Sequence, residues 1–187
     1  HEAGTIKFKG KDISKAEKSF KNSIGVVFDE GFFYDELTLT QMKNLIASSY
    51  SHWDNGAYTH YLDAFSLRPD QTISSLSRGM KMKFSLALAL SHHAELLIMD
   101  EPTSGLDPLV RKQFIEILKE FMVQGGKAVF YSTHNTSDLD KAADMLVMID
   151  NGKILFEEDK DMLLETHRLV KGKGLLPSEA KKLFLKV

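Results

Sequence analysis

The chain has 187 residues, of which 43% are hydrophobic and 27% charged, with a formal net charge of −2 at pH 7 and no cysteine. This is the composition of a globular domain, and it excludes disulfides, thiolate metal sites and the strongly basic surface of a general nucleic-acid binder. No apolar run approaches the roughly 18 residues of a membrane span, and no signal-peptide pattern opens the chain. The sequence therefore predicts a soluble, cytoplasmic protein whose contact with a membrane would run through a partner.

The first part of the chain predicts two strands followed by helices. Residues 5–9 alternate in polarity and lead into a turn, and residues 24–28 form a continuous apolar run typical of a buried strand. Residues 38–75 carry no strand signal and predict helices that are interrupted at WDNG and RPD, with Thr38 or Thr40 as the first helix cap. We expect these residues to form a helical subdomain.

Strands and helices alternate from Ser77 onward, which favours a parallel α/β sheet. The predicted elements are a helix over 77–93 that ends in His92 and His93, a strand over 95–99, an amphipathic helix over 109–124, a strand over 127–132, a short helix over 138–143, a hairpin at Asn151 and Gly152, and a basic helical tail from about residue 158. A histidine at a helix C-terminus meets a favourable partial negative charge when it is protonated.

Two carboxylates follow a buried strand directly, in the stretch LLIMDEPTSGLDP over residues 96–108. Adjacent acids repel one another and lose hydration at such a place, so Asp100 and Glu101 indicate a bound metal cation or a water that has to lose a proton. Ligands of an open parallel sheet bind beyond the carboxyl ends of its strands, where these acids are predicted to lie. The alternative is that both acids only cap the strand or the following turn.

Two further segments have residues suited to binding anions. Ser132, Thr133 and His134 end a second strand, where a histidine can bind a phosphate or simply be a polar residue with satisfied hydrogen bonds. Ser77 and Gly79 lie where a loop becomes a helix, and the free N–H groups of a helix N-terminus attract anions. A plain helix cap remains the alternative for Ser77.

The segments LSRGM (76–80), LLIMDEPTSGLDP (96–108) and STH (132–134) occur in this order along the chain. The sequence from about residue 4 to 157 resembles the nucleotide-binding domain of ABC transporters. The three segments are similar to that family's signature motif, its Walker B segment with the D-loop, and its switch histidine. The resemblance implies an α/β fold of the P-loop NTPase kind, with a parallel sheet and a helical subdomain, that binds ATP and Mg²⁺.

The resemblance also implies roles for individual residues at the strand ends. Asp100 would hold Mg²⁺ through water, and Glu101 would be the general base for the water that attacks the γ-phosphate. His134 would contact the same γ-phosphate.

Other implied roles involve a second copy of the domain, because the family works as a dimer with two ATP molecules between the copies. Ser77 and Gly79 would reach the γ-phosphate held by the other copy, and Asp107 would organise the contact between copies. Arg78 stands where the family has glycine, and its charge would pair with phosphate or with a neighbouring acid. Met80 stands where the family has glutamine.

The largest departure from the family is that no stretch of the 187 residues has the phosphate-loop spacing G-x-x-x-x-G-K-[ST]. We therefore expect the chain to be a fragment that begins after this loop and that hydrolyses ATP poorly by itself. Asp29 stands where the family has the Q-loop glutamine, and its carboxylate remains able to bind Mg²⁺ or a water.

These expectations divide the chain into an incomplete ATPase core over 1–37 and 76–157, a helical subdomain over 38–75 and a helical tail over 158–187. The implied function is that of the ATP-binding subunit of an ABC transporter, most similar to bacterial exporters, at the inner face of the cell membrane. Its implied partners are a transmembrane permease and a second ATP-binding domain. The alternatives are an ABC-type ATPase without a membrane partner, and a non-catalytic interaction module.

Overall fold

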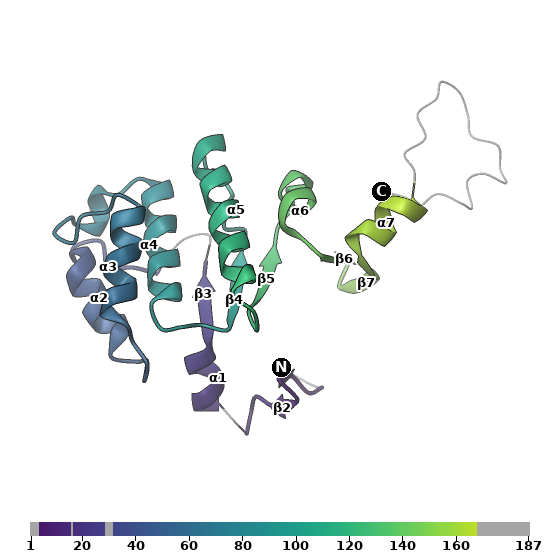
Figure 1. The fold of residues 1–187 in the computed structure, drawn as a ribbon, viewed down its shortest axis with the longest axis horizontal. Coiled ribbons are helices and arrows are strands. Elements are labelled where there is room, and N and C mark those ends of the chain that lie inside the picture. The colour runs from purple at the N-terminus through teal and green to yellow at the C-terminus, as the bar shows by residue number, and fades with distance from the viewer. Residues whose placement is uncertain (1–3, 16, 29–31, 168–187) are drawn as a thin grey trace. The chain divides into compact units, whose positions relative to one another are not determined.

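The computed structural model describes residues 4–15, 17–28 and 32–167. The chain divides into two compact units, residues 1–142 and residues 143–187. The first unit holds a three-stranded sheet with its helices, and the second holds a hairpin and one helix (Figure 1). Among the helices of the described residues, none is both long and apolar enough to cross a membrane.

The sheet of the first unit consists of β3 (Ile24–Val27), β4 (Leu96–Asp100) and β5 (Ala128–Ser132), in the order β3-β4-β5 with every pair parallel. This confirms the predicted parallel α/β fold. Because side chains alternate along a strand, the register divides the sheet into two faces. Both faces are apolar, but only one of them is buried.

The buried face packs on α4 (Arg78–Leu90), a helix with eight buried residues. The approach of β3 to this helix is close: a Cβ built on Gly25 would lie 2.9 Å from the backbone oxygen of Ala89. Glycine is therefore required at this position for packing rather than for an unusual backbone angle.

Residues 38–75 are helical, as predicted, with α2 (Leu39–Ala47), α3 (Asn55–Ala64) and a short 3₁₀ helix, η1 (Ile73–Ser75). Thr38 caps α2 and forms a reciprocal capping box with Gln41. Both α2 and α3 pack on α4, within the same compact unit as the sheet. A separate role for these helices toward a partner stays a prediction.

The other elements of the first unit are β1 (Lys7–Phe8), β2 (Lys11–Asp12), α1 (Glu17–Ser23), α5 (Pro108–Val123) and α6 (Thr136–Ala142). Strands β1 and β2 form a short antiparallel hairpin. The sequence did not predict α1, whose packing includes an edge-to-face contact between the rings of Phe8 and Phe20. Helix α5 begins where predicted because Asp107 caps it and Pro108 occupies its first position.

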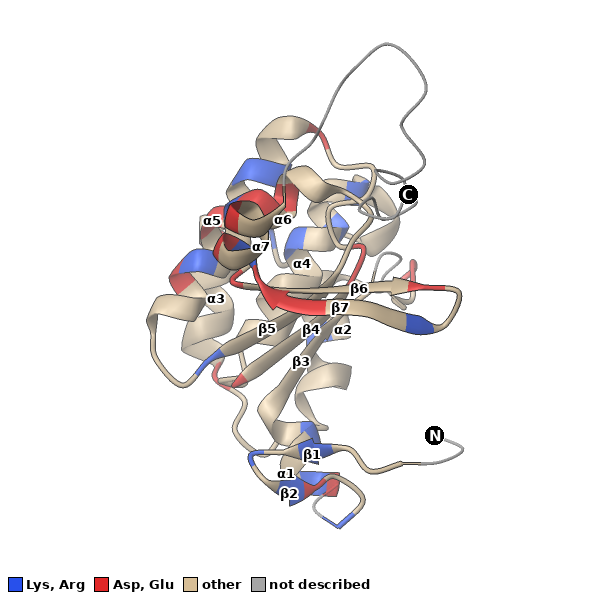
Figure 2. Cartoon of the chain, turned by 90° about the vertical axis from the view of Figure 1, so that its right-hand side faces the viewer, with Lys and Arg blue, Asp and Glu red and all other residues tan. Residues whose placement is uncertain are grey.

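The second unit contains the predicted hairpin, formed by β6 (Met145–Asp150) and β7 (Lys153–Asp159). Asn151 and Gly152 both have positive φ angles, 47° and 74°, as a two-residue type I′ turn requires. Strand β7 ends in three consecutive acids (Figure 2) and leads into α7 (Lys160–Thr166), which Asp159 caps. The rest of the predicted tail, residues 168–187, lies outside the described residues.

Candidate functional site

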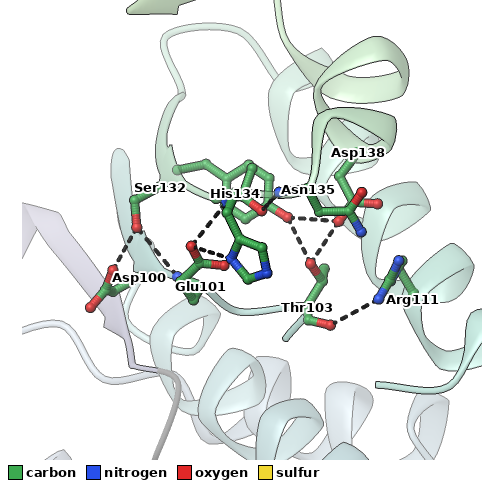
Figure 3. A network of polar contacts seen from close by, with 10 residues as sticks. Asp100, Glu101, Thr103, Arg111, Ser132, His134, Asn135 and Asp138 are labelled. Atoms are coloured by element: carbon green, nitrogen blue, oxygen red, sulfur yellow. Dashed lines mark hydrogen bonds and ion pairs between the residues drawn. The ribbon is translucent and has the colours of Figure 1, made fainter. Parts of the chain in front are cut away.

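The candidate site begins at the ends of β4 and β5, which lie side by side. Asp100 and Ser132 are paired in the register of the two strands. The Ser132 hydroxyl donates a hydrogen bond to Asp100 Oδ1 (2.6 Å), and the Glu101 N–H donates to the Ser132 carbonyl (3.1 Å). The residues that follow both strands are thereby held at one edge of the sheet (Figure 3).

Glu101 and His134 meet across this edge. Glu101 Oε1 accepts a hydrogen bond from the backbone N–H of His134 (2.9 Å) and lies 2.8 Å from its ring Nδ1. The His134 side chain is 78% exposed, whereas that of Glu101 is 29% exposed. The histidine is therefore open to a ligand, and the glutamate is held behind it with a fixed orientation.

Two features set Glu101 apart from an ordinary strand-end acid. Its φ angle is +44°, in the left-handed region that a residue with a side chain rarely occupies, which costs of the order of 1 kcal/mol or more. Its second oxygen, Oε2, is buried and has no hydrogen-bond partner. Oε1 accepts a backbone N–H as the oxygen of a cap would, whereas Oε2 accepts none.

The donor set fits Mg²⁺ in the way this ion usually binds. Among the described residues, no three side chains of His, Cys, Asp or Glu lie close enough to hold a metal ion by themselves. Mg²⁺ usually keeps several waters and takes one or two protein carboxylates together with phosphate oxygens. Asp100 is exposed, and the Ser132 hydroxyl fixes the orientation of its carboxylate by donating to Oδ1. A single exposed carboxylate of this kind suits that mode of binding.

The residues of the signature-like segment lie together with the turn that precedes α5. Ser77 caps α4 by accepting a hydrogen bond from the Met80 N–H (3.3 Å). The Arg78 guanidinium lies against Gly105, with Nη1 2.6 Å from the position that a Cβ would take there. A Cβ on Gly79 would lie 3.3 Å from the Val110 side chain.

Asp107 lies in the same turn, where it caps α5. Its Oδ1 accepts hydrogen bonds from the N–H groups of Leu109 and Val110, both at 3.0 Å. Its role toward a second copy stays a prediction, as do the ATP contacts of Ser77, Arg78 and Gly79. Asp29, the remaining predicted site residue, lies outside the described residues.

The structure adds residues that the sequence did not indicate, in a buried polar cluster beside the Glu101–His134 pair (Figure 3). Thr103 and Tyr131 both donate hydrogen bonds to Asp138 Oδ2, over 2.6 Å and 3.1 Å. Arg111 Nη2 reaches the Thr103 carbonyl at 3.5 Å. Burial raises the pKa of the Tyr131 phenol to about 12, so this group is a hydrogen-bond donor at neutral pH.

Comparison with known proteins places this sequence in one family. A family model described as "ABC transporter" matches residues 1–104, more than half of the chain. The bacitracin transport ATP-binding protein BcrA of Bacillus licheniformis is 29% identical over 168 residues, covering 89% of this chain and 55% of that protein. The linearmycin resistance ATP-binding protein LnrL of Bacillus subtilis is 30% identical over 160 residues, covering 83% of this chain and 51% of that protein.

Solved structures support the fold. A structure described as the ATP-binding subunit of an ABC transporter superposes with a TM-score of 0.75 at 23% identity, covering 88% of this chain and 70% of the other. CbiO1 from Clostridium perfringens, part of the ABC transporter complex cbiONQ, gives a TM-score of 0.71 at 22% identity over 88% of this chain and 70% of its own. The chain spans about half the length of the curated relatives described above. By its sequence and its fold, it belongs to the ABC transporter family.

Proposed function

We propose that the chain supplies the hydrolytic residues of an ABC-type ATP-binding subunit, with Glu101 as the general base. The observation that carries the proposal is the asymmetry of the Glu101 carboxylate. Oε1 is held by the backbone N–H and the ring of His134, whereas Oε2 is buried without a hydrogen-bond partner, so the carboxylate is fixed in orientation and partly desolvated. A base that is partly desolvated and fixed in orientation contributes about 10²–10⁴-fold to a hydrolytic rate.

The other residues of the strand ends have supporting roles in this proposal. Asp100 would hold Mg²⁺ through water, and when bound the ion would neutralise charge on the phosphates. His134 has a side chain that is 78% exposed and would bind the γ-phosphate of ATP through its ring. No stretch of the 187 residues has phosphate-loop spacing, so the proposal assigns binding of the β-phosphate to no residue of this chain.

A second ATP-binding domain would complete the site. Ser77, Arg78 and Gly79 start α4 beside the turn that carries Asp107, so both implied dimer contacts are on neighbouring segments. A helix N-terminus with a serine cap suits a phosphate of the facing copy. The geometry supports this proposal in one specific respect: the two segments are in contact and would move as one body.

A transmembrane permease is the proposed membrane partner, and export is the proposed direction. Support comes from the relatives, which include BcrA, named for bacitracin transport, and proteins named for Nod factor export in Rhizobium and Neorhizobium. With such a partner the chain would work at the cytoplasmic face of the membrane. The transported substrate is chosen by the permease and is not part of the proposal.

The test is ATP hydrolysis by the complete product of the reading frame that encodes this chain. Replacement of the base by an amide, Glu101→Gln, is expected to lower kcat by at least about 10²-fold while nucleotide binding persists. The control is Glu120→Gln, which changes an exposed acid on α5 and is expected to leave kcat unchanged. A Glu101→Gln enzyme with the original kcat would overturn the assignment of the base.

The absence of phosphate-loop spacing favours a second candidate, a non-catalytic interaction module. A binding measurement on the same complete product distinguishes the ATPase from the interaction module. If the complete product binds no ATP in the presence of Mg²⁺, as measured by calorimetry, the ATPase proposal fails and the interaction module is supported. The 187-residue chain by itself is expected to show no measurable turnover under either function.

A further inference from the structure

The buried cluster of Thr103, Tyr131 and Asp138 has no part in the roles described so far. Thr103 is 1% exposed and Asp138 is 0% exposed. Each hydroxyl has one proton to donate, and Asp138 Oδ2 accepts both. The 3.0 Å between the Thr103 and Tyr131 oxygens follows from this shared acceptor. Within the cluster, Asp138 Oδ2 is the point at which the hydrogen bonds converge.

The members of the cluster come from the two segments that also carry Glu101 and His134. Thr103 follows Glu101 by two residues, and Asp138 follows His134 by four. Among the connections between the two segments are the exposed contact between Glu101 and His134 and the buried hydrogen bond between Thr103 and Asp138. The buried connection is the shorter of the two and is shielded from water.

The positive φ angle of Glu101 makes such a second connection necessary. A backbone conformation of this kind persists only where the surrounding structure holds it in place. The segment after Glu101 is fixed by Thr103, which is bound from α6 through Asp138 and from α5 through Arg111. A buried hydrogen bond is stronger than an exposed one, because no water competes for its partners.

We propose that Thr103 and Asp138 are positioning residues: their buried hydrogen bond fixes the segment after β4 against the segment after β5 and so keeps the Glu101 carboxylate on His134. The catalytic meaning of this proposal rests on the proposed function, in which Glu101 is the base. The structural part of the proposal is independent of that function, because Glu101 and His134 contact each other within this chain.

The backbone N–H of His134 reports the contact directly, because it donates to Glu101 Oε1. Amide hydrogen exchange is measured by NMR on the isotope-labelled 187-residue chain. Thr103→Val keeps the shape of the side chain and removes its hydroxyl, and it is expected to speed exchange of the His134 N–H by at least about tenfold. Thr103→Ser restores a hydroxyl at the same place and is expected to restore slow exchange.

The control amide is that of Val110, which also donates to a carboxylate oxygen but belongs to the separate cap formed by Asp107. Its exchange is expected to be the same in all variants, whereas a general loss of structure would speed it as well. Tyr131→Phe removes the 3.1 Å hydrogen bond to Asp138 and the 3.0 Å contact with the Thr103 hydroxyl but leaves the hydrogen bond between Thr103 and Asp138 in place. It is expected to speed His134 exchange by a smaller factor, which provides a test if Thr103→Val fails to fold. If Thr103→Val folds and its His134 exchange is unchanged, the proposal is overturned. If Thr103→Val does not fold, unchanged His134 exchange in folded Tyr131→Phe overturns it.

Kinetics on the complete product then test the catalytic meaning. Thr103→Val is expected to lower kcat for ATP by about tenfold with little change in KM, since it displaces the base and touches no phosphate. Faster exchange with an unchanged kcat in an active enzyme would overturn positioning of the base. A wild-type product without any hydrolysis would instead refute the proposed function, and the exchange data would still decide whether Thr103 and Asp138 hold Glu101 on His134.

Discussion

The two faces of the central sheet are made by the same three strands and behave differently. On the covered face, Leu97 and Met99 are 0% and 1% exposed. On the open face, Val26, Ile98 and Phe130 lie side by side in the register, and Val26 and Phe130 are 36% and 63% exposed. Hydrophobic residues alone thus do not tell which face forms the core. The core is the face on which a helix can approach closely, as Gly25 permits for α4.

This difference separates two physical roles. The covered face contributes the free energy of folding, because its side chains are removed from water against α4 and α5. The open face leaves apolar surface in contact with water, which favours association with another surface. Replacing one residue at a time on each face measures the two contributions independently.

The largest expected effect is on the covered face. Leu97→Ala removes a fully buried side chain and leaves a cavity, which is expected to lower the free energy of unfolding by about 2–5 kcal/mol. Its neighbour on the open face provides the control, because Ile98→Ala removes a similar side chain that is only partly buried. Urea denaturation measures both. Equal losses in the two variants would show that the open face is covered in solution.

The strands of the sheet could be predicted because each one is indicated by the residues of its own short segment. The apolar runs at 24–28, 95–99 and 127–132 each end at polar residues, and the structure places strands over all three. The alternation along a strand does not show which side a helix will take, since Leu97 and Ile98 are equally apolar. Helix α1 was missed because residues 17–23 contain only one large apolar side chain, Phe20, and therefore show no periodicity.

The residues of the candidate site also divide into those that local sequence indicates and those that only the structure brings together. Asp100 and Glu101 were found from the sequence because two acids at a strand end are unusual, and His134 because it ends a second strand. The Thr103–Asp138 hydrogen bond joins residues 35 apart, so no local spacing reveals it. Arg78 was recognised as a departure from the family, but only the structure shows its guanidinium against Gly105.

A smaller effect is expected at the rim of the covered face, where α4 meets β3. His92 is 2% exposed, stacks on Tyr50 with ring centroids 3.8 Å apart, and has Nε2 2.8 Å from the Ile24 carbonyl. Burial lowers the pKa of His92 and outweighs the hydrogen bonds to the Ile24 and Leu88 carbonyls, which raise it. The sequence favoured a charged histidine at this helix end, but desolvation outweighs the helix dipole here.

The consequence is a dependence of stability on pH. Below about pH 6.5 the unfolded chain binds a proton at residue 92 that the folded chain resists, so the free energy of unfolding falls as pH falls. The loss is at most about 1.4 kcal/mol for each pH unit. Urea denaturation between pH 6.5 and 5.5 measures it in wild type and in His92→Gln, which is expected to lose most of the slope. His93→Gln changes a side chain that is 63% exposed and is expected to keep it.

The smallest change in stability is expected for a substitution on the open face. There we expect the main effect to be on association between copies of the chain. Phe130→Ser replaces a side chain that is 63% exposed, so the free energy of unfolding is expected to change by no more than about 0.5 kcal/mol.

The edge strands β3 and β5 and the apolar surface between them favour contact between copies of the wild-type chain. Sedimentation equilibrium is therefore expected to show self-association that weakens in Phe130→Ser. Val123→Ser is the matched control, since Val123 is 85% exposed and belongs to the end of α5 rather than to a strand of the sheet. A wild-type chain that stays monomeric at high concentration would show that apolar exposure on this face does not suffice for association.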